Sequence, residues 1–558
     1  MSSGVSRRSV LQAAGIGTAL GATGFSLTGC SSSGSSGQNK IGSEGKELAP
    51  FPAYVPWTKG PAADLPGTEE GVQAAYLKYP AEPADALAEK PGDGSKVTIW
   101  ISSWNSSPLP RGRNKFWQAA EKALGVELDV TVVPAMEYSK KLAALMASGE
   151  MPDIMQLVAT PNEAQFVPAK CQDLSEFIAG DAVKKYPYLA NIPTYAWKSS
   201  GRYAGKIYGI PVERPLAGHG HIVNKAKFKE AGLLVPEIGG IGVDEFTQGL
   251  EQLSQKGKAA LGAQKDGGFG FNAWMPAFGT PNVWSVKDGA FVNYIETDEF
   301  LAGLEQMVKW QGKRVYRRDA LAIDGLQEKT EFLGQKVFSK VNSPIDFKGN
   351  VIEAKGRFEI DYALPFKPSN GATPVHWLGG GIYGSGQTVL KKAPKARIEM
   401  LLRVLDALGA PFGTKEWELF NYGVEGTHFT RGKDGGPVPA ELAVSGGDGP
   451  NILPLYYLSA APSPLYYPDQ PTAVKAQHAW QSQVVPIGVK SAHLGLRTDA
   501  WASAEEALNR LREDAIKDVV TGRKKLSDWP SIVKNHMNKG GKQAAEQLAK
   551  EYAAAQKA

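Results

Sequence analysis

Residues 96–158 carry the feature that most constrains the fold, an alternation of short apolar runs with segments of helical composition. The apolar runs alternate or cluster as strands do, and the segments between them end at glycines. Strand, helix, strand, helix, strand is the unit of a parallel, doubly wound sheet, in which ligands bind beyond the carboxyl ends of the strands. The sequence therefore predicts an α/β protein. The strands are expected at 96–101, 126–133 and 152–158, and the helices at 114–124 and 137–148.

The first thirty residues have the layout of a bacterial export signal and are set aside before the fold is considered. Arg7 and Arg8, followed by an apolar pair, resemble the twin-arginine signature, although an ordinary basic start is the alternative. Leu27 to Cys30 resembles the bacterial lipobox, in which the cysteine thiol receives a diacylglyceryl group. The weakly apolar stretch between these motifs is broken by glycines, which disfavours a spanning helix. We therefore expect export, removal of residues 1–29 and lipid on Cys30, which holds the chain at the outer face of the cell membrane.

Residues 30–46 follow as the lipidated cysteine and a Ser/Gly-rich tether that is too poor in apolar residues to fold. Removal of the signal takes Arg7 and Arg8 but no acid, so the formal net charge falls from +5 to +3. That charge demands no nucleic-acid partner. Cys171 is the second of two cysteines, so we expect no intramolecular disulfide and a packed, unreactive thiol.

The rest of the chain is long enough for two or three domains. Residues 47–95 are rich in Pro, Ala and acids, and we expect an irregular extension there. In the C-terminal third, a helix is expected at 395–408, stopped by Gly409, and further helical segments at 501–520 and 540–557.

Three blocks resemble the extracellular solute-binding proteins of ATP-driven importers, in particular the large sugar-binding lipoproteins. They are Leu145 to Ile154 (LMASGEMPDI), Gly205 to Pro211 (GKIYGIP) and Asn421 to Phe429 (NYGVEGTHF). The resemblance implies a two-lobed periplasmic-binding-protein type II fold, with a hinge and a ligand cleft between the lobes. It also implies an extracytoplasmic, monomeric receptor, without a cofactor, that captures a carbohydrate and delivers it to the transmembrane subunits of an ABC permease.

The same resemblance locates the lobes along the chain. The first crossover is expected at 211–215, and the first strand of the second lobe at 219–224, followed by a helix at 244–256. A return crossover is expected between 364 and 383. Lobe 1 is then 96–212 and lobe 2 is 213–374, each completed by an undetermined part of 375–558.

Sugar sites combine flat aromatic surfaces, which stack on C–H faces, with planar polar side chains that bond hydroxyls. In lobe 1 and at the first crossover, the candidates follow strand ends. For Trp104, the alternative is a loop tryptophan that covers the core. For Glu213 and Arg214, the alternative is a salt bridge that fixes the hinge. These candidates are Trp104, Asn105, Thr160 with the nearby Asn162, Glu213 and Arg214.

In lobe 2, Trp274 and Trp284 lie in a Gly/Pro/Asn-rich stretch without helical spacing, which favours a cleft lining over a core helix. Trp377 precedes three glycines, where a backbone can approach a ligand closely. That glycine run lacks the Gly-Lys-Ser/Thr ending of a phosphate loop. Glu425 matches the third block, and bracing the turn around it is the equal alternative.

Two other classes of protein stay open at this point. A membrane-tethered glycoside hydrolase also pairs aromatics with two carboxylates, held about 5 to 9.5 Å apart. No Gly-x-Ser-x-Gly or His-Glu-x-x-His pattern supports an enzyme, and His219 and His221 fit structural histidines better than metal ligands. A peptide-binding lipoprotein of an importer is the second alternative. We expect a binding protein that is not an enzyme.

Overall fold

The computed structural model describes residues 40–556, except 106, 159, 161–162, 256, 266–267 and 355. Contacts divide the chain into Met1–Gln38 and Asn39–Ala558, and the fold below is that of the second unit. The predictions for Arg7, Arg8, Cys30 and Asn162 lie outside the described residues.

The first lobe is built on a five-stranded sheet with the order β2-β1-β3-β11-β4. β1 runs parallel to β2 and β3, whereas β11 is antiparallel to β3 and β4. β4 therefore runs in the direction of β1, and the carboxyl ends of four strands share one edge. The strands are β1 (Lys96–Ser103), β2 (Glu127–Pro134), β3 (Ile154–Leu157), β4 (Gly209–Glu213) and β11 (Ile382–Leu390).

The helices predicted between these strands begin and end at residues that cap them. α1 (Lys115–Leu124) begins after Asn114, whose side chain accepts a hydrogen bond from the backbone N–H of Trp117, and it ends at Gly125 with φ 67°. α2 (Ala135–Ser148) likewise ends at Gly149, with φ 74°. Further helices of this lobe are α3 (Glu163–Lys170), α6 (Thr194–Ser200), α13 (Lys395–Leu408) and α14 (Lys415–Tyr422).

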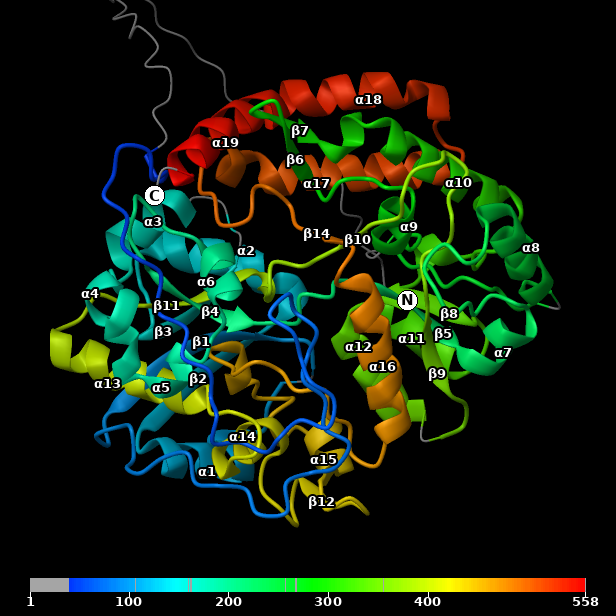
Figure 1. Cartoon of the computed structure of the whole chain (residues 1–558). Coiled ribbons are helices and arrows are strands. Elements are labelled where there is room, and N and C mark those ends of the chain that lie inside the picture. Colours follow the sequence, from blue (N-terminus) through cyan, green and yellow to red (C-terminus); the bar gives the residue numbers. More distant parts are fainter. Residues whose placement is uncertain are drawn as a thin grey trace, which may run out of the picture. The chain divides into compact units, whose positions relative to one another are not determined.

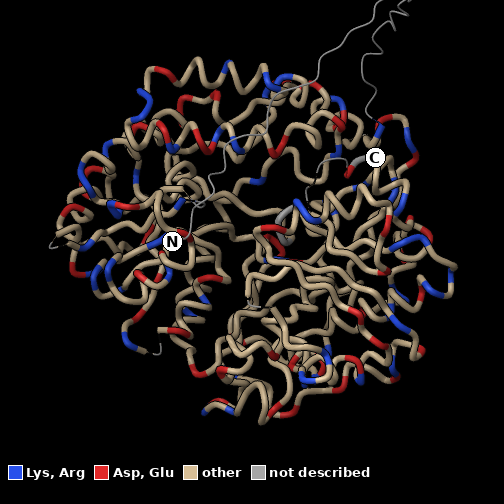
Figure 2. The backbone as a smooth tube through the Cα atoms, turned by 180° about the vertical axis from the view of Figure 1, so that it is seen from behind, with Lys and Arg blue, Asp and Glu red and all other residues tan. Residues whose placement is uncertain are grey.

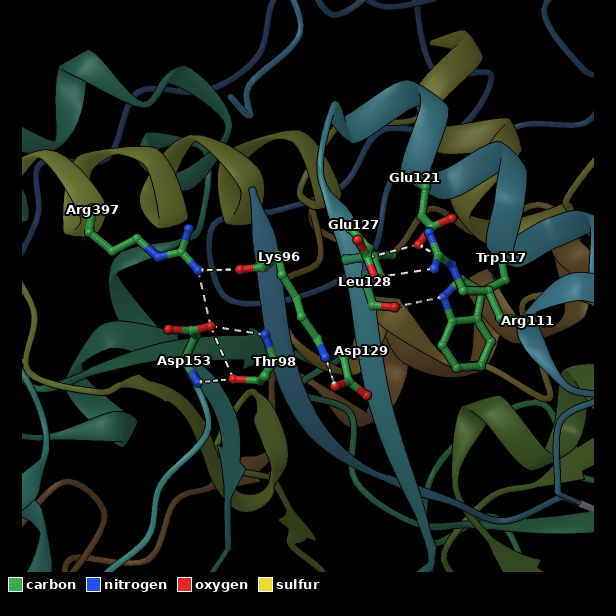
Figure 3. Close-up of polar contacts among 10 residues, drawn as sticks. All are labelled: Lys96, Thr98, Arg111, Trp117, Glu121, Glu127, Leu128, Asp129, Asp153 and Arg397. Atoms are coloured by element: carbon green, nitrogen blue, oxygen red, sulfur yellow. Dashed lines mark hydrogen bonds and ion pairs between the residues drawn. The ribbon is translucent and has the colours of Figure 1, made fainter. Parts of the chain in front are cut away.

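Asp153 ties three elements of this lobe together (Figure 3). Its carboxylate accepts hydrogen bonds from the backbone N–H and hydroxyl of Thr98, at 2.9 and 3.0 Å, and Arg397 of α13 approaches it at 3.0 Å. The Asp153 N–H donates in return to the Thr98 hydroxyl at 2.9 Å. This exchange joins β1 to the start of β3, which gives the Pro-Asp-Ile end of the first sequence block a structural role.

The second lobe is built on a sheet with the order β8-β5-β9, in which both neighbours are antiparallel to β5. Adjacent residues of β5 point to opposite faces, so Val223 packs into one core and Ile222 into another. The strands are β5 (Gly220–Asn224), β8 (Ser339–Asn342) and β9 (Ile360–Ala363). α8 (Val243–Leu253), α9 (Phe271–Ala277) and α10 (Asp298–Gly312) contribute to the first core, and α11 (Gly325–Leu333), α12 (Pro344–Ala354) and α16 (Pro471–Val484) to the second.

Three chain segments connect the two sheets (Figure 1). Residues 214–219 lead from β4 to β5, so the strand expected at 219–224 begins at Gly220. Residues 364–381 return from β9 to β11 and include β10 (His376–Trp377), which pairs in parallel with β14 (Gly488–Val489). The segment after 458 leads from the helices of the first lobe to α16. This architecture confirms the predicted two-lobed α/β fold.

The C-terminal third divides between the lobes. α13 and α14 pack on α5 (Pro187–Ala190) and α1 of the first lobe. α17 (Asp499–Val520), α18 (Trp529–His536) and α19 (Lys542–Ala555) lie together in Figure 1, and α17 packs against α10 of the second lobe. The amino-terminal part of α17 also contacts α3, so this helix touches both lobes.

Residues 47–95, which we call the strap, contain no helix or strand along their fully described length. The strap contacts the first lobe, where Val55 N–H donates to Ala190 O, then the second, and then the first again, where Gly92 N–H donates to Leu124 O. On the second lobe, Gln73 N–H donates to Gln481 Oε1 of α16 at 2.9 Å. Acidic and basic residues are interspersed along the backbone of both lobes (Figure 2).

Candidate functional site

The carboxyl edge of the first sheet presents exposed apolar groups to the side where β4 leaves for the second lobe. Trp104 follows β1 and is 62% exposed, and Met136 follows β2 and is also exposed. The Asn105 side chain donates to Asn451 O at 2.7 Å. Thr160 is buried, and its hydroxyl donates to Val158 O at 2.7 Å. Of these sequence candidates, Trp104 keeps much of its side chain exposed to solvent.

A cavity of about 410 Å³ lies where two of the crossing segments, 214–219 and 364–381, meet α9 and α17. One wall is aromatic and consists of Phe271, Tyr294 and Trp377. Another part of the lining is one face of α17, because its lining residues recur at helical spacing. These residues are Glu505, Asn509, Arg512, Glu513, Ile516 and Lys517.

Trp377 is held rigidly in the aromatic wall. Its indole Nε1–H donates to Thr280 O at 2.8 Å, and its ring lies 5.5 Å from the centroids of both Phe271 and Tyr294. The neighbouring segment at 379–381 contains the three glycines noted in the sequence, and Gly379 also lines the cavity. A fixed ring beside a polar helix face suits a ligand that has both apolar and hydroxyl-bearing surfaces.

Polar groups line the same cavity, and two of them have unused hydrogen-bonding capacity. Arg512 donates to Asn509 at 2.7 Å and to Glu513 at 3.1 Å, and its guanidinium lies 5.8 Å from the Tyr294 ring centroid. In the described part of the chain, the side chains of Asn272 and His219 make no hydrogen bond. They can therefore bond a ligand without breaking a contact of the protein.

The structure buries Trp274 and Trp284 inside the second lobe, and neither of them lines this cavity. Trp274 is buried among aromatic rings, 4.8 Å from His221, and its Nε1–H donates to Phe269 O at 2.6 Å. Trp284 begins β6 (Trp284–Lys287), is fully buried and packs edge-on against Trp501 at 5.6 Å. Neither ring has a free face for a ligand in this structure.

Glu213 lies at the end of β4 and holds two crossing segments together. Its carboxylate accepts hydrogen bonds from the Tyr195 hydroxyl at 2.6 Å and from Ser463 N–H at 3.1 Å. Burial raises the pKa of Glu213 to about 7, against the opposing effect of these bonds. The Arg214 guanidinium lies 5.4 Å from the Tyr457 ring centroid. In this structure, Glu213 acts on the hinge rather than on the cavity.

Glu425 braces a turn beside the first lobe. Its half-exposed carboxylate pairs with Arg431 at 2.7 Å. Within the same block, the buried His428 ring accepts a hydrogen bond from Val424 N–H at 2.9 Å and lies 3.0 Å from Asp448. In this structure Glu425 therefore stabilises a turn, which is the alternative role expected for it from the sequence.

Trp377 is a ligand-binding candidate from the sequence that also lines the cavity. Phe271 and Asn272 belong to the stretch that was singled out for Trp274, because α9 turns its first residues toward the cavity and Trp274 toward the core. The α17 face was missed. The residues of this face are mostly polar and recur every three or four positions, which is a pattern that the sequence shows. The sequence did not show which lobe this helix joins, so the pattern could not be connected with the site.

Three further observations concern metal binding, membrane-spanning helices and the thiol of Cys171. Among the described residues, no group of three or more His, Cys, Asp or Glu side chains is arranged to hold a metal ion. Within the same residues, every helix is too short or too polar to cross a membrane. Cys171 is buried, and burial raises the pKa of its thiol to about 12.

Two α/β lobes joined by crossing segments, with a cavity lined by two of these segments, define a hinged ligand-binding protein. The family model of the bacterial extracellular solute-binding proteins matches residues 115–398, just over half of the chain. The chain therefore belongs to that family, whose members are substrate-binding proteins and not enzymes.

Individual relatives are distant. The polygalacturonan/rhamnogalacturonan-binding protein YtcQ of Bacillus subtilis is 24% identical over 62% of this chain and 69% of its own length. Lipoprotein LipO of the same organism is 28% identical over 41% of this chain and 47% of its own. Among solved structures, an HMO-binding, ABC-transporter-associated solute-binding protein from Bifidobacterium longum infantis superposes with a TM-score of 0.62 at 13% identity. That superposition covers 83% of this chain and 99% of the other.

Proposed function

We propose that this chain is a receptor that captures an oligosaccharide between its lobes and delivers it to an ABC permease. The observation that carries the proposal is the cavity, which is lined by a rigid aromatic wall and by a polar face of α17. Aromatic rings stack on the C–H faces of sugars while amide and carboxylate groups bond the hydroxyls. The relatives named for polygalacturonan and HMO binding support a carbohydrate ligand.

Capture by closure is feasible in energy. Moving a population from 1:99 open to 99:1 closed takes about 5.5 kcal/mol of differential affinity. A micromolar ligand supplies about 8 kcal/mol in total. Glu213 joins the end of β4 to the crossing segment at Ser463, and this junction lies where such a motion has its axis. Trp104, exposed at the edge of the first sheet, would meet a ligand that already lies on Trp377.

The experiment is a calorimetric screen of neutral and acidic oligosaccharides and of peptides against the purified protein. We expect reversible sugar binding without release of reducing ends. Trp377→Phe should weaken binding at least fivefold, because a smaller ring stacks less, whereas Trp417→Phe, buried in a separate aromatic cluster, should leave binding unchanged. Peptide binding or hydrolysis of the sugar would overturn the proposal.

We further propose that the receptor is anchored by lipid on Cys30 after twin-arginine export, with a tether that begins at Ser31 and ends before the buried Ile41. The lipobox resemblance and the lipoprotein relative support this. Cys30→Ser should leave the signal uncut or release the protein from membranes, without a change in sugar affinity of the purified protein. Retention of the variant on membranes after cleavage of its signal would contradict the anchor.

A further inference from the structure

One end of the cavity has an excess of carboxylates. Arg497, just before α17, approaches Glu163 of α3 at 3.7 Å and donates to Ser200 O at 2.7 Å. Glu163 also accepts a hydrogen bond from the buried Tyr203 hydroxyl. Glu505 lies near this pair, and both Arg497 and Glu163 influence its ionisation. Two carboxylates thus share one guanidinium that is already bonded to the first lobe.

Glu505 is the member of this group that reaches the cavity. Its side chain makes no hydrogen bond or ion pair in the described part of the chain. Burial raises the pKa of Glu505 to about 7, with Glu163 adding to the effect of burial and Arg497 and Arg512 opposing it. The surroundings therefore already disfavour one negative charge, and a second charge from a ligand would be opposed more strongly.

The cations of the cavity are poorly placed to offset a ligand charge beside Glu505. Arg512 is near enough to favour the charged form of Glu505, but it is already bonded to Asn509 and Glu513, and the Glu513 carboxylate balances its charge. Lys517 lies twelve residues further along α17, about 18 Å away at 1.5 Å per residue, which exceeds the Debye length of about 8 Å at physiological salt. His493 lines the cavity nearby, and burial lowers its pKa to about 4, so this ring is neutral at pH 7.

From this placement we infer that Glu505 makes its end of the site selective for uncharged sugar units, and rejects units that carry a carboxylate. The inference rests on the proposed function. A hydroxyl of a neutral sugar can donate to the Glu505 carboxylate, whereas a uronate brings a like charge into a partly desolvated space. The chain would then differ from a receptor for polygalacturonan, whose units are acids.

The test uses pairs of oligosaccharides that differ only in charge: oligogalacturonides with their methyl esters, and sialylated oligosaccharides with their desialylated forms. Calorimetry at pH 7.5 gives the Kd of each member. For every pair that binds, the uncharged member should bind at least tenfold more tightly to the wild-type protein. Equal or tighter binding of the charged member overturns the inference and leaves the proposed receptor function intact.

Glu505→Gln identifies the residue responsible, since it removes the charge and keeps the shape. It should reduce the preference for the uncharged member to threefold or less. The matched control is Glu506→Gln on the same helix, because Glu506 is exposed and pairs with Arg510 at 3.3 Å. An unchanged preference in Glu505→Gln overturns the role of this residue. If the variant fails to fold, the wild-type preference still decides selectivity. If no sugar of the series binds to the wild-type protein, the proposed receptor function is overturned as well.

Discussion

Single residues hold the first lobe together at positions that the sequence motifs mark. Asp153 accepts three hydrogen bonds and is about one-fifth exposed, whereas Asp129 forms a half-exposed ion pair with Lys96 on the same sheet (Figure 3). Asp153→Ala leaves Thr98 and Arg397 without this acceptor, and we expect it to lower the free energy of unfolding by about 2 kcal/mol.

Asp129→Ala is the matched control for this measurement. An exposed ion pair contributes about 0 to 1 kcal/mol, so the loss in this variant should be small. Urea unfolding of the two variants and the wild-type protein compares the free energies directly. Equal losses in the two variants would contradict the structural role assigned to Asp153.

Glu213 should make stability depend on pH. Its pKa is raised to about 7 in the folded protein from about 4.5, so the folded state binds more protons in that interval. The stabilising contribution is complete below pH 4.5 and is lost as the pH rises through 7. Glu213→Gln removes the titration but can still accept from Ser463 and donate to Tyr195. We expect its stability relative to the wild-type protein to increase by up to about 3 kcal/mol between pH 5 and 8.

Thermal melts at pH 5, 6, 7 and 8 measure this difference. Glu425→Gln is the control, because Arg431 holds the pKa of that exposed carboxyl below its usual range. Its titration therefore lies below the pH window of the experiment. A constant difference between Glu213→Gln and the wild-type protein over this window would contradict the raised pKa.

At the scale of elements, the sequence predicted local structure well and side-chain direction poorly. The helix 395–408 has the predicted bounds, because its apolar pattern and the final Gly409 depend on neighbours in sequence. Trp274 was assigned to the cleft because its surroundings looked like a loop, yet these residues form α9, whose rotation decides which ring enters the core. The cavity-lining face of α17 required knowledge of which lobe that helix joins, and only long-range packing determines this.

Composition predicts that the strap is irregular, but it does not predict which contacts hold the strap on the lobes. Gln73 and Gln481 exchange two hydrogen bonds, at 2.9 and 2.7 Å, and Gln481 is fully buried. Gln73→Ala leaves a buried amide without its partner, which costs about 1 to 3 kcal/mol. We expect a lower melting temperature and faster hydrogen exchange in residues 65–77. Lys78→Ala, an exposed position in the strap, should change neither. Unchanged exchange in Gln73→Ala would show that other contacts hold the strap.

At the scale of the whole second unit, a contact between the lobes should influence closure. Lys348 of α12 in the second lobe lies 5.8 Å from the Tyr422 ring centroid of α14 in the first, and 5.6 Å from that of Tyr467. Burial lowers the pKa of Lys348 to about 8, so the amine is mainly charged at pH 7. A cation over an aromatic ring contributes about 0.5 to 2 kcal/mol. This contact therefore favours arrangements in which the lobes are close.

Lys348→Met keeps most of the side-chain volume and removes the charge. If closure follows ligand binding as proposed, the closed population falls, and the apparent sugar affinity should weaken by about 2- to 30-fold. Lys258→Met is the control, because Lys258 lies 5.9 Å from the Phe338 ring within the second lobe alone. X-ray scattering should show a smaller radius of gyration with bound sugar in the wild-type protein, and a larger ligand-free radius in Lys348→Met. Wild-type curves that superimpose with and without sugar would contradict a hinge that closes, since the ligand would then bind without moving the lobes.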